Sequence, residues 1–190
     1  MKPNIGQGDT GKTSLLGGKE KCNKDIPQVE AYGTIDELNS LVGFIRSHEL
    51  SKKIDRALAR VQDDLFRAES HVSTAPGFEN FPHLSVFDKK RVAYLEEQIQ
   101  KWEKSFAAPE HFVLPGGTRE AALCDMARTL SRRAERRLVT WMRDVPETPA
   151  RHEIYRYINR LSDFFFTLEL YLNHEAGKSQ PTWVGREKRN

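Results

Sequence analysis

His111-Phe-Val-Leu-Pro-Gly-Gly-Thr118 leads directly into Arg119-Glu-Ala-Ala-Leu-Cys-Asp-Met-Ala-Arg-Thr-Leu-Ser-Arg-Arg-Ala-Glu-Arg-Arg137. The Pro-Gly-Gly turn is followed by Thr118, whose hydroxyl can accept a hydrogen bond from a free N–H of a first helical turn. Beyond it, apolar residues recur every three or four positions, at Leu123, Ala127, Leu130, Ala134, Leu138 and Trp141. This spacing predicts one long helix that buries a single face and ends near residue 143.

A second stripe on the same helix is formed by Arg128, Arg132 and Glu135, which are also three to four residues apart. At about 100° per residue, this stripe points well away from the apolar one. Arginine presents a planar fork that grips phosphate or carboxylate through two parallel hydrogen bonds. From the helix alone, an anion-binding face and an ordinary solvated or ion-paired face are equally good interpretations.

Apolar stripes predict four further helices, at residues 28–48, 52–74, 85–106 and 150–176. Ser85 and Asp88 resemble a capping box at the start of the third, and Gly177 suits the position after the last. In the first helix Asp36 lies near the apolar stripe, where a lone carboxylate needs a cationic partner. Five amphipathic helices with short links and no credible strand predict an all-α, up-and-down five-helix bundle.

The chain divides into three parts by composition. Residues 1–27 are rich in glycine and lysine and lack helical periodicity, so we expect a flexible segment there. Residues 28–177 form the bundle, and residues 178–190 form a basic tail.

The chain has 190 residues, of which 38% are hydrophobic and 30% charged, and its net charge of +3 is too small to require nucleic acid. Cys22 and Cys124 lie in no metal or redox spacing. Without a membrane-spanning run or a signal-peptide pattern, we expect a cytoplasmic protein.

The segment from Gly6 to Thr13 fits the phosphate-loop pattern G-x-x-x-x-G-K-[ST]. That pattern denotes a P-loop only where a buried strand leads into it and a helix leaves it. Here the preceding residues are short and polar, and Gly17 and Gly18 interrupt any helix on the other side. We therefore interpret the match as coincidental in fold, although glycine N–H groups and a lysine still suit a polyphosphate.

Four blocks of sequence carry a resemblance to a known family. They are Gly8-Asp-Thr-Gly-Lys-Thr-Ser-Leu-Leu-Gly-Gly18 with Lys24-Asp25, Val29-Glu-Ala-Tyr-Gly-Thr-Ile-Asp-Glu-Leu-Asn39, Phe112-Val-Leu-Pro-Gly-Gly-Thr118 with Ala127-Arg-Thr-Leu-Ser-Arg-Arg-Ala-Glu-Arg-Arg137, and Tyr157-Ile-Asn-Arg-Leu-Ser-Asp-Phe-Phe165. Together they resemble the PduO-type ATP:cob(I)alamin (corrinoid) adenosyltransferases. The blocks span nearly the whole chain, so the match is far more specific than the phosphate-loop pattern.

The resemblance implies a five-helix bundle that assembles as a homotrimer, with active sites between neighbouring subunits. The implied reaction transfers the 5′-deoxyadenosyl group of ATP, bound with Mg²⁺, to the cobalt of cob(I)alamin. Its products are adenosylcobalamin and tripolyphosphate. The implied functional partners are a cob(II)alamin reductase and an adenosylcobalamin-dependent enzyme, with no role for nucleic acid or membrane.

The resemblance also implies roles for individual residues. Catalysis would involve Arg128, Arg132 and Phe112, and an intersubunit pair would join Asp36 to Arg128. Phe112 and Asp163 would contact the corrinoid, with Phe112 keeping the dimethylbenzimidazole ligand off cobalt. ATP would be held by the glycine-loop group Gly8, Asp9, Gly11, Thr13, Ser14 and Lys24, and by the helical group Arg132, Arg133, Glu135, Arg136 and Asn159. No protein ligand of the metal is implied, because Mg²⁺ would be bound mainly through the phosphates.

Some positions depart from the family pattern. Ile5 and Gly6 stand where members usually carry threonine and a basic residue, which removes a hydroxyl and a charge from the phosphate loop. Asp125 and Leu170 stand where many members have histidine and arginine. We interpret the chain as a divergent member of the family.

Other functional classes remain alternatives. A P-loop kinase or NTPase would need Lys12 and would release ADP or phosphate. A nucleic-acid-binding helix would use residues 128–137, but no exposed aromatic is interleaved with that basic run. An inactive paralogue with a structural or cobalamin-chaperone role would keep the helical stripes without the chemistry.

Overall fold

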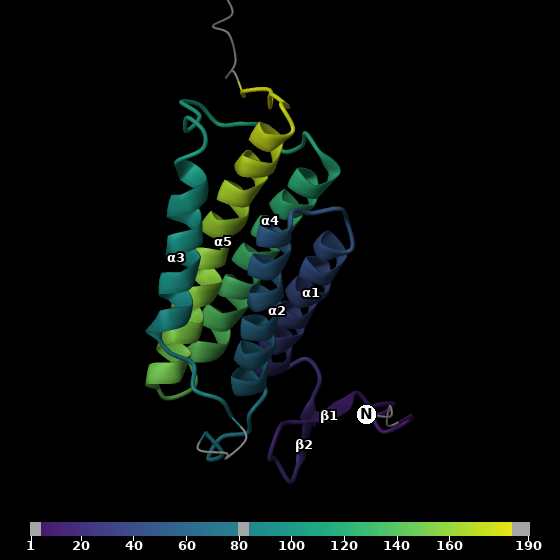
Figure 1. Ribbon diagram of the computed structural model, residues 1–190. Helices are drawn as coiled ribbons and strands as arrows, with labels where there is room; N and C mark the ends of the chain where they lie inside the picture. The colour runs from purple at the N-terminus through teal and green to yellow at the C-terminus, as the bar shows by residue number, and fades with distance from the viewer. Residues whose placement is uncertain (1–4, 80–83, 184–190) are drawn as a thin grey trace, which may run out of the picture.

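The computed structural model describes residues 5–79 and 84–183. The elements, in chain order, are a small hairpin followed by five helices (Figure 1): β1 (Lys12–Ser14), β2 (Lys21–Asn23), α1 (Pro27–Arg46), α2 (Lys52–Val72), α3 (Lys89–Glu103), α4 (Arg119–Met142) and α5 (Pro149–Glu175). The predicted five helices are confirmed, each within a few residues of its expected bounds. None of the helices in this described part is long and apolar enough to cross a membrane.

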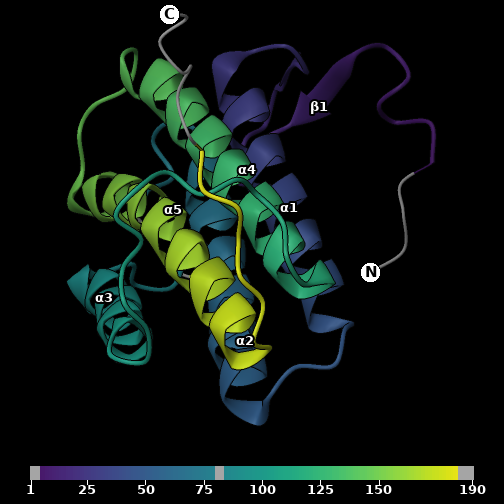
Figure 2. The ribbon, with the colours of Figure 1, turned by 90° about the horizontal axis from the view of Figure 1, so that it is seen from above.

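Helix α4 lies at the centre of the arrangement, packed along α5 on one side and α1 on the other. Helix α2 packs on α1, and α3 packs on α5. Seen from above, Figure 2 shows α3 beside α5 and α4 beside α1. The five helices therefore pack side by side around a shared core. The up-and-down bundle is the architecture that the apolar stripes predicted.

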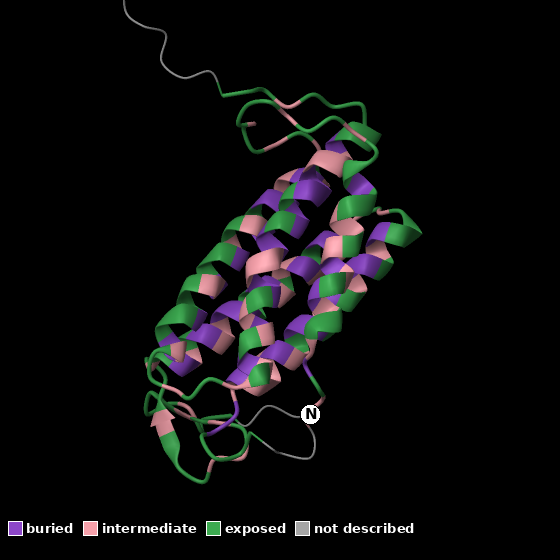
Figure 3. Cartoon of the chain, turned by 90° about the vertical axis from the view of Figure 1, so that its left-hand side faces the viewer, coloured by how far each residue is buried: buried purple, intermediate pink, exposed green. Residues whose placement is uncertain are grey.

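The core consists of the inward faces of all five helices, and Figure 3 shows buried residues alternating with exposed ones along the helices. Its largest fully buried side chains include Tyr157, Phe164 and Phe165 of α5. Trp102 of α3 packs on Phe164 at 5.0 Å between ring centroids.

Most helix ends agree with the sequence. Thr118 caps α4, because its hydroxyl accepts a hydrogen bond from the Ala121 N–H at 3.1 Å. At the end of α5, Gly177 has φ +63°, and N–H groups of Gly177 and Lys178 bond back to the carbonyls of His174 and Asn173. This pair of bonds is a Schellman motif, which requires the left-handed conformation that glycine adopts readily.

The predicted start of the third helix is wrong. Helix α3 begins at Lys89, and Asp88 is its N-cap, accepting a hydrogen bond from the Lys90 N–H at 3.0 Å. Ser85 lies before the helix, where its carbonyl oxygen contacts His71 Nε2 at 2.8 Å. The side chain at 88 therefore begins the helix instead of completing a capping box.

The expectation that the chain has no strand is also wrong. Strands β1 and β2 pair antiparallel, with Thr13 opposite Cys22. Each has only three mostly polar residues, so neither shows the apolar alternation that identifies a strand. The glycine loop precedes β1 and no helix follows it, which confirms that the segment is not a P-loop. Cys22 and Cys124 are free thiols.

The hairpin is fixed to the bundle at the end of α2. Leu16 donates its N–H to the Ser73 carbonyl at 2.8 Å and accepts from the Ala75 N–H at 2.9 Å. The predicted flexibility of residues 1–27 and the domain limits at 27 and 177 stay predictions, and residues 1–4 and 184–190 lie outside the described chain.

Candidate active site

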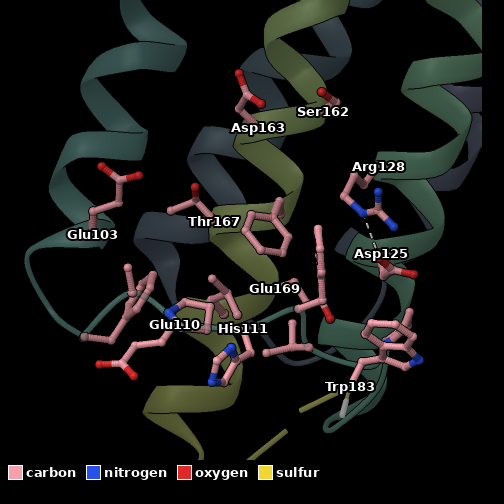
Figure 4. Close-up of a pocket in the computed structure, with 18 of the residues that line it drawn as sticks. Glu103, Glu110, His111, Asp125, Arg128, Ser162, Asp163, Thr167, Glu169 and Trp183 are labelled. Atoms are coloured by element: carbon pink, nitrogen blue, oxygen red, sulfur yellow. Dashed lines mark hydrogen bonds and ion pairs between the residues drawn. The ribbon is translucent and has the colours of Figure 1, made fainter. Parts of the chain in front are cut away.

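A cleft of about 1060 Å³ opens between α3, α4, α5 and the segment that leads into α4. Figure 4 shows the side chains of these three helices converging on it with those of Glu110, His111 and Trp183. Four residues singled out from the sequence line it together: Phe112, Arg128, Arg132 and Asp163. The two positions that depart from the family pattern, Asp125 and Leu170, line it as well.

The side chain of Phe112 lines the cleft and is largely exposed to solvent. It is 82% exposed, and Trp183 beside it is 58% exposed. Exposed aromatic rings that line a concave surface are suited to contact a large, flat, partly apolar ligand. The cleft is therefore an open binding surface with an aromatic wall.

The segment that carries Phe112 is tied to α5 by one asparagine. Asn173, itself buried, accepts a hydrogen bond from the Thr118 N–H at 2.9 Å and donates one to the Gly116 carbonyl at 2.9 Å. Gly117 has φ +99°, and a Cβ there would collide with the Asn173 amide. Gly117 thus lets the backbone pass directly over Asn173.

The charge of the cleft is mixed. Arg128 bonds to Asp125 one turn earlier on α4, with Nε and Oδ1 2.8 Å apart (Figure 4). Asp163 bonds to Arg160 on α5 at 2.7 Å. Three more carboxylates line the cleft, from Glu103, Glu110 and Glu169. Arg132 is exposed and forms no ion pair with any described residue, which leaves its guanidinium available to an anionic ligand.

Glu169 is the cleft residue that the sequence reasoning missed. Its side chain is buried, and this burial, together with the nearby Asp125, raises the pKa of the Glu169 carboxyl to about 7. A signal was present in the sequence, because Glu169 lies four residues after the core residue Phe165 and so occupies an inward-facing position of α5. Gln180 and Trp183, which lie beyond the last helix, gave no such signal.

Helix α4 carries its arginines in two rows. Arg128, Arg132 and Arg136 lie four residues apart, and the first two face the cleft. Arg133 and Arg137 form the other row and pair with Glu37 and Glu30 of α1. The structure therefore directs Arg133, which the resemblance placed at ATP, toward α1 in the single chain.

Glu135 is also fixed by partners within the chain. Its Oε1 accepts a hydrogen bond from Asn159 Nδ2 at 2.8 Å and one from the Tyr155 hydroxyl at 3.4 Å. Two residues predicted together at ATP, Glu135 and Asn159, are thus neighbours on facing sides of α4 and α5.

The glycine loop is organised by lysines of the hairpin. Lys24 donates from Nζ to the Gly8 carbonyl at 3.0 Å, and its own N–H donates to the Gly11 carbonyl at 2.9 Å. Lys21 Nζ donates to the Gln7 carbonyl at 2.8 Å. Asp9 and Ser14 are exposed, and Thr13 is half-buried in β1. The glycine loop therefore brings lysine ammonium groups and hydroxyl groups together at the hairpin end of the molecule.

The sequence predicts that Asp36 needs a cationic partner, and the resemblance places that partner on a neighbouring subunit. Asp36 is exposed on α1, so water solvates its carboxylate. It lies near Glu69, whose pKa is raised to about 7 by burial and, to a smaller extent, by Asp36. Asp36 and Arg128 form no pair in the described chain, and their pairing stays a proposal about neighbouring subunits.

The glycine loop and the segment that carries Phe112 lie at opposite ends of the molecule. Figure 1 shows the hairpin below the bundle and the segment between α3 and α4 above it. The 24 residues of α4 span about 36 Å between these ends. A single chain therefore does not bring the glycine loop to Phe112.

Comparison with known proteins identifies the family of the chain. The family described as cobalamin adenosyltransferase matches residues 4–172. A corrinoid adenosyltransferase of Bacillus subtilis is 35% identical over 184 residues, which cover 93% of this chain and 89% of the relative. A cobalamin adenosyltransferase of Cupriavidus metallidurans is 34% identical over 178 residues, with 93% and 90% covered.

A solved structure extends the likeness to the fold. It is a phenylalanine-to-histidine variant of the PduO-type ATP:corrinoid adenosyltransferase from Lactobacillus reuteri, complexed with cobalamin and ATP. It superposes with a TM-score of 0.88 at 32% identity and covers 97% of each chain. The chain belongs to the cobalamin adenosyltransferase family and is of the PduO type.

Proposed function

We propose that this protein is an ATP:corrinoid adenosyltransferase that transfers the 5′-deoxyadenosyl group of ATP to the cobalt of cob(I)alamin. The observation that carries the proposal is the cleft, which joins the exposed ring of Phe112 to an arginine row on one wall. Such a cleft can hold a broad corrinoid against the aromatic side chains and an anion against the guanidinium groups.

The reaction is a displacement at the ribose C5′ carbon. The two electrons of Co(I) form the cobalt–carbon bond, the C5′–oxygen bond breaks, and the triphosphate leaves as tripolyphosphate. Negative charge grows on the departing oxygen, so preorganised cations near the phosphates stabilise the transition state. The row from Arg128 to Arg136 spans about 12 Å along α4, which suits a triphosphate laid along the helix.

Each remaining residue receives a role from its position. Lys24 and the N–H groups of the loop from Gly8 to Ser14 hold phosphate oxygens, and Thr13 and Ser14 offer hydroxyls. Glu135, held by Asn159, accepts hydrogen bonds from the nucleoside. Phe112 covers the lower face of the corrin and keeps the dimethylbenzimidazole off cobalt, while Asp163 orders that side. Arg133 adds positive potential at the edge of the site while it pairs with Glu37.

The active site is formed between two copies of the chain. The separation of the glycine loop from Phe112 supports this part of the proposal, because ATP is far shorter than α4. In a homotrimer the loop of one subunit meets the arginine row of its neighbour. Asp36, exposed near the middle of α1, then pairs with Arg128 of the neighbouring copy, in competition with Asp125, which pairs with Arg128 within the chain.

Mg²⁺ binds together with ATP. The metal is held mainly by phosphate oxygens of the bound ATP. A reductase that supplies Co(I) and an enzyme that uses adenosylcobalamin are the partners that the chemistry requires. We assign the protein to the cytoplasm, where both thiols stay reduced.

An anaerobic spectral assay tests the reaction. Chemically reduced cob(I)alamin is mixed with ATP, Mg²⁺ and protein, and the loss of the Co(I) absorption band is followed together with the phosphate products. We expect a loss that needs both protein and ATP, with tripolyphosphate formed in equal amount. Release of ADP or phosphate with an unchanged Co(I) band would favour an NTPase and reject the proposal.

A further inference from the structure

Phe112 owes its position to its backbone, because its side chain is 82% exposed and packing does not hold it. A functional side chain without packing is only as well placed as the backbone that carries it. Asn173 fixes the turn at Gly116 and Thr118, but this anchor lies four residues beyond Phe112. The contacts that hold residues 112–114 must therefore differ from those that hold the turn.

The C-terminal segment supplies the second anchor. Residues 180–183 run antiparallel to residues 112–114, with Val113 opposite Thr182. Leu114 donates its N–H to the Pro181 carbonyl at 2.8 Å, and Trp183 donates to the Phe112 carbonyl at 2.6 Å. Figure 2 shows this segment crossing the end of the bundle between α5 and α4. An isolated pair of such short strands is at best marginally stable in water.

One side chain ties this pair of segments to the bundle. Gln180 Nε2 donates to Glu169 Oε1 at 2.6 Å and to the Leu114 carbonyl at 3.4 Å. Both bonds use the same NH₂ group, which has two hydrogens to give. Glu169 is 1% exposed and belongs to the rigid helix α5, so Gln180 connects the Phe112 segment to the core.

We propose that Glu169 and Gln180 are positioning residues for Phe112, acting as a latch that fastens residues 180–183 and 112–114 to α5. The proposal rests on the function proposed above, in which Phe112 covers the lower face of the corrin. Glu169 and Asn173 are one turn apart on α5, so a single helix face anchors both ends of the segment that carries Phe112. The latch matters to a corrinoid with a lower ligand, because Phe112 must exclude that ligand from cobalt.

The first test needs no substrate. Hydrogen exchange followed by mass spectrometry compares the wild type with Gln180→Leu, which keeps the size of the side chain and removes the NH₂ group. We expect about tenfold faster exchange in peptides that contain Leu114 and Trp183, as one lost tertiary anchor allows. Gln100→Leu, at an exposed position of α3, is the matched control and leaves these peptides unchanged. Unchanged exchange in Gln180→Leu would overturn the latch.

The second test asks whether the latch acts through Phe112. With cob(II)alamin and a reductant, Gln180→Leu should slow adenosylation about tenfold; with cob(II)inamide, which lacks the dimethylbenzimidazole, it should have little effect. In a Phe112→Ala background the same substitution should cause no further loss, because coupled residues are not additive. Glu169→Gln keeps an acceptor for Gln180 and should retain the wild-type rate, whereas Glu169→Leu should behave like Gln180→Leu.

The outcomes separate the two proposals. Equal slowing with both corrinoids, or additive losses in the double variant, would overturn the positioning role. A wild type that shows no adenosylation would reject the proposed function, and the exchange experiment would still decide whether the latch exists.

Discussion

The two ends of the bundle carry binding surfaces of different construction. At the hairpin end the surface is mostly backbone, a glycine loop whose carbonyls are held by Lys21 and Lys24. At the other end it is made of side chains from three helices around an open cleft. The first kind suits small anions and the second a large ligand. One reaction needs both, which is why we place the active site between two copies of the chain.

The two arginine rows of α4 also differ in their surroundings. Arg133 and Arg137 pair with Glu37 and Glu30 in the same chain, so their guanidinium groups lie against α1. Arg132 faces the cleft and has no such partner among the described residues.

The largest expected effect belongs to the cleft row. Arg132→Ala should lower kcat about 10²–10³-fold, because it removes a preorganised charge from the departing triphosphate. Arg132→Lys should be intermediate, since lysine keeps the charge but loses the planar fork. Steady-state rates with cob(I)alamin measure both, and thermal melting confirms that the variants fold. A wild-type rate for Arg132→Ala would remove Arg132 from the site.

A pH-dependent effect is expected at Glu169. Its pKa is raised from 4.5 to about 7 by burial and by Asp125, so the folded chain retains a proton that the unfolded chain releases. This contribution favours the folded state below pH 4.5 and is lost as the pH rises to 7. Glu169→Gln should therefore be more stable than the wild type at pH 8, by up to about 3 kcal/mol, with little difference near pH 4.5.

Denaturant unfolding at several pH values measures this difference. Glu175→Gln, at an exposed position of the same helix, is the control and should show no such pH dependence. Equal stabilities of Glu169→Gln and the wild type at every pH would show that the carboxyl is not buried as described.

A smaller effect should appear at the subunit contact. Asp36→Ala should weaken the oligomer by about 2 kcal/mol, as expected when one partner of an interfacial ion pair is removed. Light scattering over a dilution series measures the mass. Glu37→Ala changes the next residue, whose partner Arg133 is in the same chain, and should leave the mass unchanged. An Asp36→Ala oligomer as tight as the wild type would rule out the proposed pair.

The smallest effect is expected for the row that faces α1. Arg133→Ala breaks an exposed ion pair, which is worth less than about 1 kcal/mol. We expect a slightly lower melting temperature and a loss of rate far below that of Arg132→Ala. A loss as large as that of Arg132→Ala would mean that Arg133 leaves Glu37 to bind the phosphates directly, and the two rows would then share one task.

The sequence predicted features that depend on local chemistry. Thr118 and Gly177 mark helix ends because each satisfies backbone groups of its own helix. The start of the third helix was wrongly predicted because Ser85 and Asp88 are both good caps, and only the hydrogen bond from the Lys90 N–H to Asp88 shows which one is used. The hairpin was not predicted because its stability comes from the backbone hydrogen bonds of Leu16 at the end of α2 rather than from its own residues.

The site residues likewise divide into those that local sequence predicts and those that depend on contacts between distant parts of the chain. Phe112, Arg128 and Arg132 belong to one run of sequence, and the structure keeps them on one cleft. Glu169 and Gln180 escaped notice because their importance lies in a contact across a chain reversal. No sequence pattern places the loop containing Gly8 beside Arg132, and in our proposal the two meet only across neighbouring copies of the chain.

Mixing two inactive variants tests the shared site most directly. Lys24→Ala damages the hairpin end and Arg132→Ala damages the cleft end, so neither should turn over ATP and cob(I)alamin alone. Unfolding and refolding them together in equal amounts gives mixed oligomers. If each site takes its loop from one chain and its arginines from the next, about a quarter of the sites are intact by random assembly. We predict that the mixture recovers about a quarter of the wild-type rate; a mixture as inactive as its parents would contradict an active site built from two chains.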